Sequence, residues 1–224
     1  MIKIFLDSSD INVIKEHKDQ VQGFTTNPTL MRKAGITDYQ KFCREVLKIV
    51  RTKPVSFEVF ADDPDEMERQ ARLISAWGNN VYVKIPVTNT KGKSSFELIK
   101  RLSKLKLNIT AVTELSQVKA LKNVLNPKSI ISIFAGRIAD TGLDPRESVS
   151  KTKKFFGGSA QILWASPREV LNVYQAEESG VDIITCTPDL IAKFNKFKGM
   201  NLQKLSLETV KMFHKDGREA GFKL

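Results

Sequence analysis

The chain has 224 residues, of which 41% are hydrophobic and 27% are charged, as is typical of a globular protein with one sizeable core. No apolar run approaches the roughly 20 residues that a membrane-spanning helix needs, so we expect no membrane partner. The formal net charge is +11, and nucleic-acid binding must therefore be weighed. Lysines are scattered over nearly every predicted helix, and no stretch interleaves basic residues with exposed aromatic ones as single-strand binders do. We therefore favour a solvated basic surface that attracts small anions, and expect no nucleic-acid partner.

The two cysteines, Cys43 and Cys186, are too few for a disulfide framework, which favours a reducing compartment. Residues 1–6 are followed at once by Asp7, and this segment is too short for the core of a signal peptide. We therefore expect a cytoplasmic protein.

Strand-like apolar runs alternate with helical patterns along the chain. This alternation predicts a parallel sheet, and eight such units in this length fit a closed, eight-stranded βα (TIM) barrel of the α/β class. The alternative is an open, doubly wound sheet, which usually has a glycine-rich loop after its first strand; Leu6-Asp7-Ser8-Ser9 has no glycine. The predicted strands are Ile2–Asp7, Gln22–Asn27, Val55–Phe60, Val81–Pro86, Leu107–Val112, Ser129–Gly136, Gln161–Ser166 and Val181–Thr187.

Helix starts support this interpretation. An N-cap residue followed by proline, which suits the first helical position, recurs just beyond the predicted strands, for example at Asn27-Pro28 and Ser166-Pro167. No linker divides the chain, so we expect a single domain over residues 1–224. Residues from about 202 to 222 have the pattern of an extra C-terminal helix beyond the barrel, with an apolar stripe of Leu205, Leu207, Val210 and Phe213.

Polar residues fall on the inner face of the predicted barrel. Side chains alternate between the two faces of a strand, so the apolar phase of each run faces the helices and the other phase faces inward. In residues 107–112 this rule sends Ala111 outward. Barrel active sites lie at the carboxyl ends of the strands. Near those ends the rule sends inward Asp7, Glu58, Lys84, Thr110, Ser132 and Phe134.

Lys84 is the residue around which this interior is organised. A buried lysine is costly unless it is paired or kept neutral, and a desolvated amine is a standard nucleophile for carbonyl substrates. The alternative is a structural lysine that reaches the strand end or pairs with a buried acid. The surrounding carboxylates and hydroxyls favour Schiff-base chemistry, in which a protonated imine accepts electrons from a breaking C–C bond. A metal route would need ligands, and His17 and His214 are more typical of exposed helix positions, so we expect no metal.

Two arginines predict an anion site at the same end of the barrel. Arg137 follows the predicted strand 129–136, and Arg168 lies in Ser166-Pro167-Arg168 at the start of a predicted helix. Barrels often bind phosphate at a helix N-terminus in this position. For Ser166, a role as N-cap can coexist with phosphate binding. For Arg168, an exposed helix position and a phosphate contact both stay open.

Five segments together resemble the signature segments of the transaldolase family. More narrowly, the chain resembles the small subfamily that includes fructose-6-phosphate aldolase. The resemblance runs from Ile2 to about Asp189, in the family's order. The segments are Thr25-Thr26-Asn27-Pro28, Val83-Lys84-Ile85-Pro86, Asn108-Ile109-Thr110-Ala111, Phe134-Ala135-Gly136-Arg137-Ile138 and Ala165-Ser166-Pro167-Arg168.

The resemblance implies a class I aldolase barrel that uses no cofactor and forms its Schiff base at Lys84. It implies that Asp7 moves protons at the hydroxyl beside the cleaved bond, and that Glu58 and Thr110 hold the catalytic water. It also implies a set of substrate-binding residues. These are Asn27 and Ser132 at the dihydroxyacetone part, Arg137, Ser166 and Arg168 at the phosphate, and Thr26 and Phe134 as further members.

Within this family, three positions resemble the transferase rather than the lyase. Transaldolases carry Glu, Ser and Phe where the fructose-6-phosphate aldolases carry Gln, Ala and Tyr, and this chain has Glu58, Ser132 and Phe134. The resemblance thus implies transfer of a dihydroxyacetone unit between sugar phosphates, in the pentose phosphate pathway, by a homo-oligomer (pentamer or decamer). Ile133 and Pro167 depart from the family pattern. These departures concern the geometry of the loop on the phosphate side more than the chemistry. The alternatives are an aldolase that releases free dihydroxyacetone and a basic nucleic-acid-binding barrel.

Overall fold

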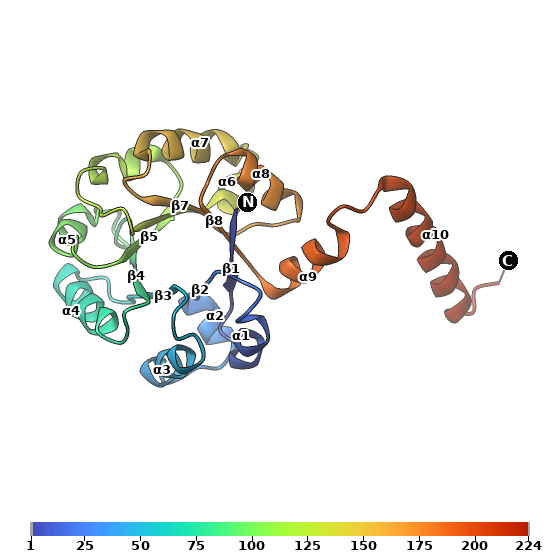
Figure 1. Ribbon diagram of the computed structural model, residues 1–224, viewed down its shortest axis with the longest axis horizontal. Coiled ribbons are helices and arrows are strands. Elements are labelled where there is room, and N and C mark those ends of the chain that lie inside the picture. The colour runs from blue at the N-terminus through green and yellow to red at the C-terminus, as the bar shows by residue number, and fades with distance from the viewer. Residues whose placement is uncertain (1, 224) are drawn as a thin grey trace. The chain divides into compact units, whose positions relative to one another are not determined.

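The computed structural model describes residues 2–223, and its first compact unit, which extends to Leu190, contains one closed barrel of parallel strands (Figure 1). The strands follow one another around the barrel in chain order, and β8 closes it against β1. The predicted α/β barrel is therefore confirmed. The strands are β1 (Lys3–Asp7), β2 (Gly23–Thr25), β3 (Val55–Glu58), β4 (Val81–Pro86), β5 (Leu107–Val112), β6 (Ile130–Ile133), β7 (Gln161–Trp164) and β8 (Ile183–Cys186).

Helices connect the strands and form a ring outside the barrel, as Figure 1 shows. Two helices follow β2 and two follow β6, whereas two short 3-10 turns replace a helix between β5 and β6. The helices of this unit are α1 (Ile11–His17), α2 (Pro28–Lys33), α3 (Tyr39–Ile49), α4 (Pro64–Ser75), α5 (Phe96–Arg101), α6 (Ala135–Ala139), α7 (Pro145–Phe156) and α8 (Leu171–Glu178).

Apolar side chains fill both the layer beneath the helices and the lower part of the barrel interior. Phe57 on β3 and Ile85 on β4, in the outward phase of their strands, are completely buried. Inside the barrel, Phe5 belongs to a buried cluster with Leu163. Gly23 pairs with Phe5 across β1 and β2, and a Cβ at this glycine would lie 2.4 Å from the Phe5 ring. Gly23 therefore leaves room for the Phe5 ring, which fills the barrel interior two residues before Asp7 on β1.

The strands lie where the sequence predicts them, but several ends differ. β4 and β5 have the predicted bounds, whereas the strand predicted to reach Gly136 already ends at Ile133. Phe134 turns out of the extended region, with φ −80° and ψ 61°, and α6 starts directly after it. Asn27 caps α2 as predicted, but the predicted cap at Ser166 is wrong, because Ser166 has a φ of 59° and α8 begins only at Leu171.

A bulge in β5 overturns one predicted side-chain orientation. The register between β5 and β6 shifts between Ile109 and Val112, and Ala111 has a left-handed φ of 61°. Ala111 consequently lines the same cavity as Thr110 instead of facing the helices. Strict alternation fails here because a bulge places an extra residue on one strand and re-aims its side chains.

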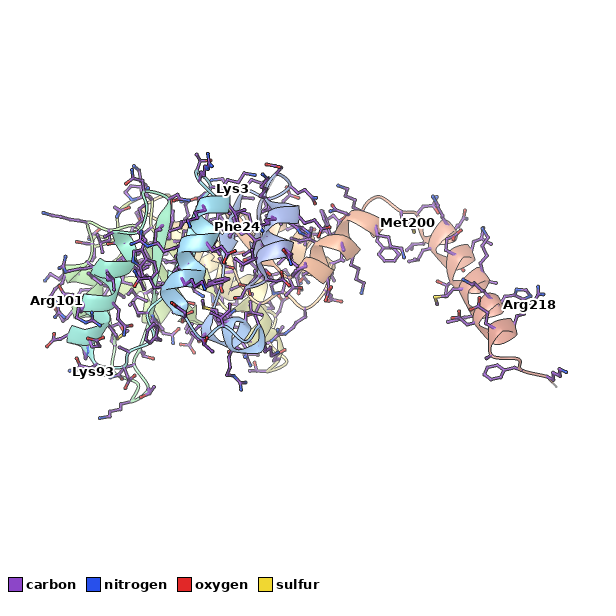
Figure 2. The ribbon with its side chains drawn as sticks, turned by 90° about the horizontal axis from the view of Figure 1, so that it is seen from below. Lys3, Phe24, Lys93, Arg101, Met200 and Arg218 are labelled. Carbon is purple, nitrogen blue, oxygen red and sulfur yellow. The ribbon has the colours of Figure 1, made fainter. Side chains whose placement is uncertain are left out.

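The second compact unit starts at Ile191. It contains most of α9 (Pro188–Phe197) and all of α10 (Leu202–Glu219). Helix α10 begins at the predicted residue 202 and ends at Glu219, slightly before the predicted end at about residue 222. Figure 2 shows the side chains of this helix between Met200 and Arg218, and none of the residues of α10 is buried in the described chain. The single domain expected over residues 1–224 stays a prediction.

Across residues 2–223, no helix combines the length and the apolar character that crossing a membrane requires. Cys43 and Cys186 are both free and buried, and burial raises the pKa of each thiol to about 12. The cytoplasmic location expected from these cysteines stays a prediction.

Candidate active site

A cavity of about 470 Å³ lies at the carboxyl ends of the strands. It is bordered by side chains from the strand ends and from the loops that follow them. Two predicted site residues, Thr26 and Arg168, do not border it. The structure brings the other predicted site residues together around this one cavity: Asp7, Asn27, Glu58, Lys84, Thr110, Ser132, Phe134, Arg137 and Ser166.

Lys84 is buried at this cavity, with 6% of its surface exposed. Its Nζ donates a hydrogen bond to the Thr26 carbonyl oxygen at 2.9 Å and lies 2.9 Å from Glu58 Oε2. The ion pair follows from the sheet register, because Glu58 on β3 is directly opposite Lys84 on β4. An ammonium has three donors, and these contacts use two of them. The third is available to a molecule in the cavity.

Asp7 is the second carboxyl group at the cavity. Burial raises the pKa of the Asp7 carboxyl above its ordinary value, while the Lys84 charge and a hydrogen bond from Thr25 act in the opposite direction. Thr25 Oγ1 donates to Asp7 Oδ1 at 2.8 Å and lies 2.6 Å from Thr185 Oγ1. A carboxyl group with a raised pKa is suited to accept and return a proton. Our sequence analysis missed Thr25 and Thr185, although both lie near the ends of strands that line the barrel interior.

Glu58 and Thr110 present one charged and one neutral group to the cavity. Thr110 is 1% exposed, and its hydroxyl finds no hydrogen-bond partner within residues 2–223. Such a buried, unpaired hydroxyl costs about 1–3 kcal/mol, so it is a preferred position for a water or substrate oxygen. The end of β3 is held by the Tyr39 hydroxyl, which donates to the Glu58 carbonyl oxygen at 2.6 Å.

The Ser132 hydroxyl is oriented by a buried amide that our sequence analysis did not single out. Ser132 Oγ donates to Asn108 Oδ1 at 2.6 Å, and Asn108 Nδ2 donates to Ser56 Oγ at 3.1 Å. Because its proton is committed to Asn108, the Ser132 oxygen offers an acceptor to the cavity. Phe134, next along the inner face, packs on the interior apolar cluster. The signal for Asn108 was its position two residues before Thr110, in the same strand phase.

Thr26 and Asn27 connect β2 to the site in different ways. Thr26 is buried, accepts from Lys84 through its carbonyl oxygen and pairs its hydroxyl with that of Ser9. Asn27 borders the cavity, and its Oδ1 caps α2 by accepting from the Leu30 amide at 3.0 Å. The cap uses only Oδ1, and Asn27 Nδ2 donates to Asp7 Oδ2 at 3.5 Å.

The two predicted phosphate-binding arginines have different surroundings. Arg137 is exposed at the cavity, and its guanidinium group makes no hydrogen bond or ion pair with the residues that the structure describes. Arg168 donates from Nε and Nη2 to the two carboxylate oxygens of Asp140, at 3.0 and 2.5 Å. Helix α6, which carries Arg137, touches the loop after β7 at Gly136, where a Cβ would lie 1.6 Å from the Ser166 carbonyl oxygen. The glycine therefore permits the close approach of this loop to α6.

Residues 2–223 contain no cluster of three or more His, Cys, Asp or Glu side chains that could hold a metal ion. The His17 ring contacts the Val13 carbonyl oxygen within α1, and His214 is exposed on α10. Neither histidine borders the cavity.

Comparison with known proteins places the chain in a family. Residues 4–224 match the family model described as Transaldolase/Fructose-6-phosphate aldolase. A probable transaldolase of Dehalococcoides mccartyi is 37% identical over 191 residues, which cover 82% of this chain and 86% of that protein. A probable transaldolase of Thermoplasma volcanium is 36% identical over 191 residues (82% and 83%), and one of Methanococcus maripaludis is 34% identical over 199 residues (86% and 89%).

Two solved structures share the barrel at low sequence identity. The crystal structure of KGPDC from Streptococcus mutans has a TM-score of 0.61 at 9% identity and covers 83% of this chain and 88% of its own. Orotidine 5'-phosphate decarboxylase from Pyrococcus horikoshii has a TM-score of 0.58 at 15% identity, with 82% and 88% covered. At these identities the likeness shows the fold alone.

A closed parallel barrel with a polar cavity at the carboxyl ends of its strands has the architecture of the barrel enzymes. The family match spans nearly the whole chain, and the relatives are alike over most of their length. The chain belongs to the transaldolase/fructose-6-phosphate aldolase family and is an enzyme of the transaldolase or aldolase type.

Proposed function

We propose that this protein is a transaldolase, which transfers a dihydroxyacetone unit between sugar phosphates through a Schiff base on Lys84. The observation that carries the proposal is the Lys84 amine, which is buried beside the cavity and lies 2.9 Å from a Glu58 carboxylate oxygen. Family membership and the names of the relatives support the same reaction.

The first step makes a nucleophile of Lys84. Transfer of one ammonium proton to Glu58 leaves a neutral amine, which attacks the ketone carbon of a ketose phosphate. The proton then passes from Glu58 to the hydroxyl of this adduct, which leaves as water, and a protonated imine is formed. Glu58 and the unpaired Thr110 hydroxyl both border the cavity and are suited to hold the water that leaves and later returns.

Asp7 then opens the carbon–carbon bond. Its carboxylate removes the proton of the hydroxyl beside that bond, and the bonding electrons move to the imine. The aldose phosphate leaves, and the dihydroxyacetone part stays on Lys84 as an enamine. An acceptor aldehyde reverses these steps and takes the proton back from Asp7. The raised pKa of Asp7 suits this double role, because the group must bind the proton and release it again.

The remaining groups hold the two ends of the substrate. Ser132 Oγ offers an acceptor, and the N–H of Asn27 Nδ2 that is not bonded to Asp7 offers a donor, for the hydroxyls of the dihydroxyacetone part. At the rim, Arg137 and Ser166 border the cavity and Arg168 lies beside it, which favours a phosphate bound by charge-assisted hydrogen bonds.

One assay separates this function from that of an aldolase. With fructose 6-phosphate and erythrose 4-phosphate, transfer produces sedoheptulose 7-phosphate, whereas cleavage without transfer produces free dihydroxyacetone. We expect transfer to be much faster than release, and Lys84→Met to lose both. If the wild-type enzyme releases free dihydroxyacetone as fast as it transfers it, the aldolase function replaces this proposal.

A further inference from the structure

Two guanidinium groups at the cavity rim differ in their availability. The Arg137 guanidinium has no hydrogen-bond or ion-pair partner among residues 2–223. The Arg168 guanidinium, in contrast, donates to both carboxylate oxygens of Asp140. The Arg168–Asp140 pair joins the loop after β7 to the end of α6, across 28 residues of sequence. Arg168 Nε lies 3.3 Å from where a Cβ of Gly136 would stand. The Arg168 guanidinium therefore lies close to Gly136 of α6, beside the cavity and not in its lining.

Asp140 is ionised when it makes this contact. The hydrogen bonds from Arg168 hold the pKa of the Asp140 carboxyl below its ordinary value, and the nearby Arg137 charge acts in the same direction. The pair is a little less than half exposed, 45% for Arg168 and 46% for Asp140, so a ligand can reach it from solvent.

A carboxylate and a phosphate group recognise the same edge of a guanidinium group. Each accepts two parallel N–H hydrogen bonds from it, and Asp140 already occupies the Nε and Nη2 donors of Arg168. A phosphate that needs this edge must displace the carboxylate. A phosphate that uses the remaining donors lies close to a like charge on Asp140, which weakens its binding.

We propose that Asp140 sets the affinity of this site for phosphate, by competing with the phosphate group of the substrate for Arg168. The inference deepens the proposed function and rests on it for the class of substrate. Arg137, whose guanidinium has no hydrogen-bonded partner to give up, binds the phosphate first, and Arg168 then exchanges its carboxylate partner for a phosphate oxygen. Asp140 thus keeps Arg168 beside the cavity when no phosphate is bound, at the cost of weaker phosphate binding.

The test is calorimetric titration of inorganic phosphate into the full chain and its variants. Asp140→Asn keeps the shape of the side chain and removes its charge, so we expect phosphate to bind about threefold tighter, as for the loss of an exposed ion pair. In an Arg168→Ala background, the same substitution should give a clearly smaller gain, because the contested group is gone and only the repulsion between Asp140 and phosphate is relieved.

Asp144→Asn is the matched control. Asp144 forms a similar carboxylate–guanidinium pair with Arg146, 51% and 49% exposed, and neither residue borders the candidate active site. This variant removes the same charge from a position four residues away and should bind phosphate as the wild type does.

Three results would overturn the proposal. Weaker phosphate binding by Asp140→Asn would mean that Asp140 positions Arg168 for phosphate instead of competing with it. An equal gain in Asp144→Asn would assign the effect to net charge. A gain of the same size without Arg168 would exclude the exchange of partners.

This titration measures binding and not turnover, so its failure is distinguishable from that of the proposed reaction. A chain that binds phosphate as expected but transfers no dihydroxyacetone contradicts the proposed function alone. As a second readout, Asp140→Asn should lower KM for a phosphorylated acceptor and leave KM for an unphosphorylated aldehyde unchanged. A fall in both KM values would contradict competition at the phosphate.

Discussion

The carboxyl groups of Asp7 and Glu58 and the amine of Lys84 border the same cavity, and the charges of Glu58 and Lys84 both act on Asp7. Burial is the largest influence on Asp7 and raises its pKa, the Lys84 charge opposes this, and the Glu58 charge adds to it. An acid whose pKa is higher in the folded state binds its proton more tightly there than in the unfolded chain. Stability is therefore lost as the pH rises from the ordinary pKa of 3.8 through the raised value.

Asp7→Asn should separate activity from stability. The substitution removes the buried charge, so we expect a higher free energy of unfolding than in the wild type at pH 7, and a smaller gain near pH 4. Loss of the proton-transfer group should lower the rate of transfer about 100-fold or more. Urea unfolding at both pH values and the coupled assay measure these effects. A lower stability at pH 7 would contradict this account of Asp7.

Phe134 should control whether the enamine is transferred or released. It borders the same cavity as Lys84 and offers no proton, whereas a tyrosine there could hydrogen-bond the held water and supply one. Phe134→Tyr, and more so its combination with Glu58→Gln, should raise release of free dihydroxyacetone and lower transfer to erythrose 4-phosphate. Phe60→Tyr, at an exposed position outside the cavity, is the control. An unchanged ratio of the two activities in Phe134→Tyr would exclude this role.

At the scale of single residues, strand alternation predicts which side chains face inward but not what they bind. It sends Lys84 and Ser132 to the same interior, where both line the cavity. It does not indicate that Asn108 orients Ser132 or that Thr25 holds Asp7. Those partners depend on the register between neighbouring strands, which the pattern within one strand does not contain.

Among the elements, the strands could be predicted because apolar residues alternate along each of them. The conformations of the loops after the strands could not be predicted in this way. Ser166-Pro167 has the composition of a helix start, yet Ser166 adopts a left-handed conformation and no helix follows before Leu171. This loop lies against Gly136 of α6, which follows a different strand. Such a contact between segments distant in sequence leaves no periodic signal.

Gly136→Ala should therefore disturb the phosphate end of the site. The added Cβ would lie 1.6 Å from the Ser166 carbonyl oxygen, and this main-chain atom must move. We expect KM for phosphorylated sugars to rise about tenfold or more, with a smaller effect on unphosphorylated aldehydes. Gly217→Ala, in α10, is the control and should leave both KM values unchanged, because its added Cβ would meet nothing within 4 Å beyond its chain neighbours and the surrounding helix backbone. Equal losses on both kinds of substrate would show that the glycine serves the fold as a whole.

At the scale of the whole molecule, α10 carries a row of large apolar side chains in solvent. Phe213 is 65% exposed, and Leu207 and Val210 are also exposed. Large apolar side chains exposed together are typical of an interface. We propose that the protein is a homo-oligomer, as the resemblance implies with its pentamer or decamer, and that α10 contributes to the contacts between chains.

Val210→Glu combined with Phe213→Glu should lower the mass of the particle in solution, because two charges would enter an apolar interface. Light scattering after size-exclusion chromatography measures this mass. Lys204→Glu, on the polar side of the same helix, should leave it unchanged. A wild-type particle with the mass of one chain would contradict the proposed assembly.

The proposed reaction depends on a covalent bond between Lys84 and the substrate. Borohydride reduction in the presence of fructose 6-phosphate, followed by peptide mass spectrometry, tests it directly. We predict one dihydroxyacetone-derived unit on Lys84, irreversible loss of activity, and no adduct in Lys84→Met. An adduct on a different lysine, or full activity after reduction with substrate, would contradict the account.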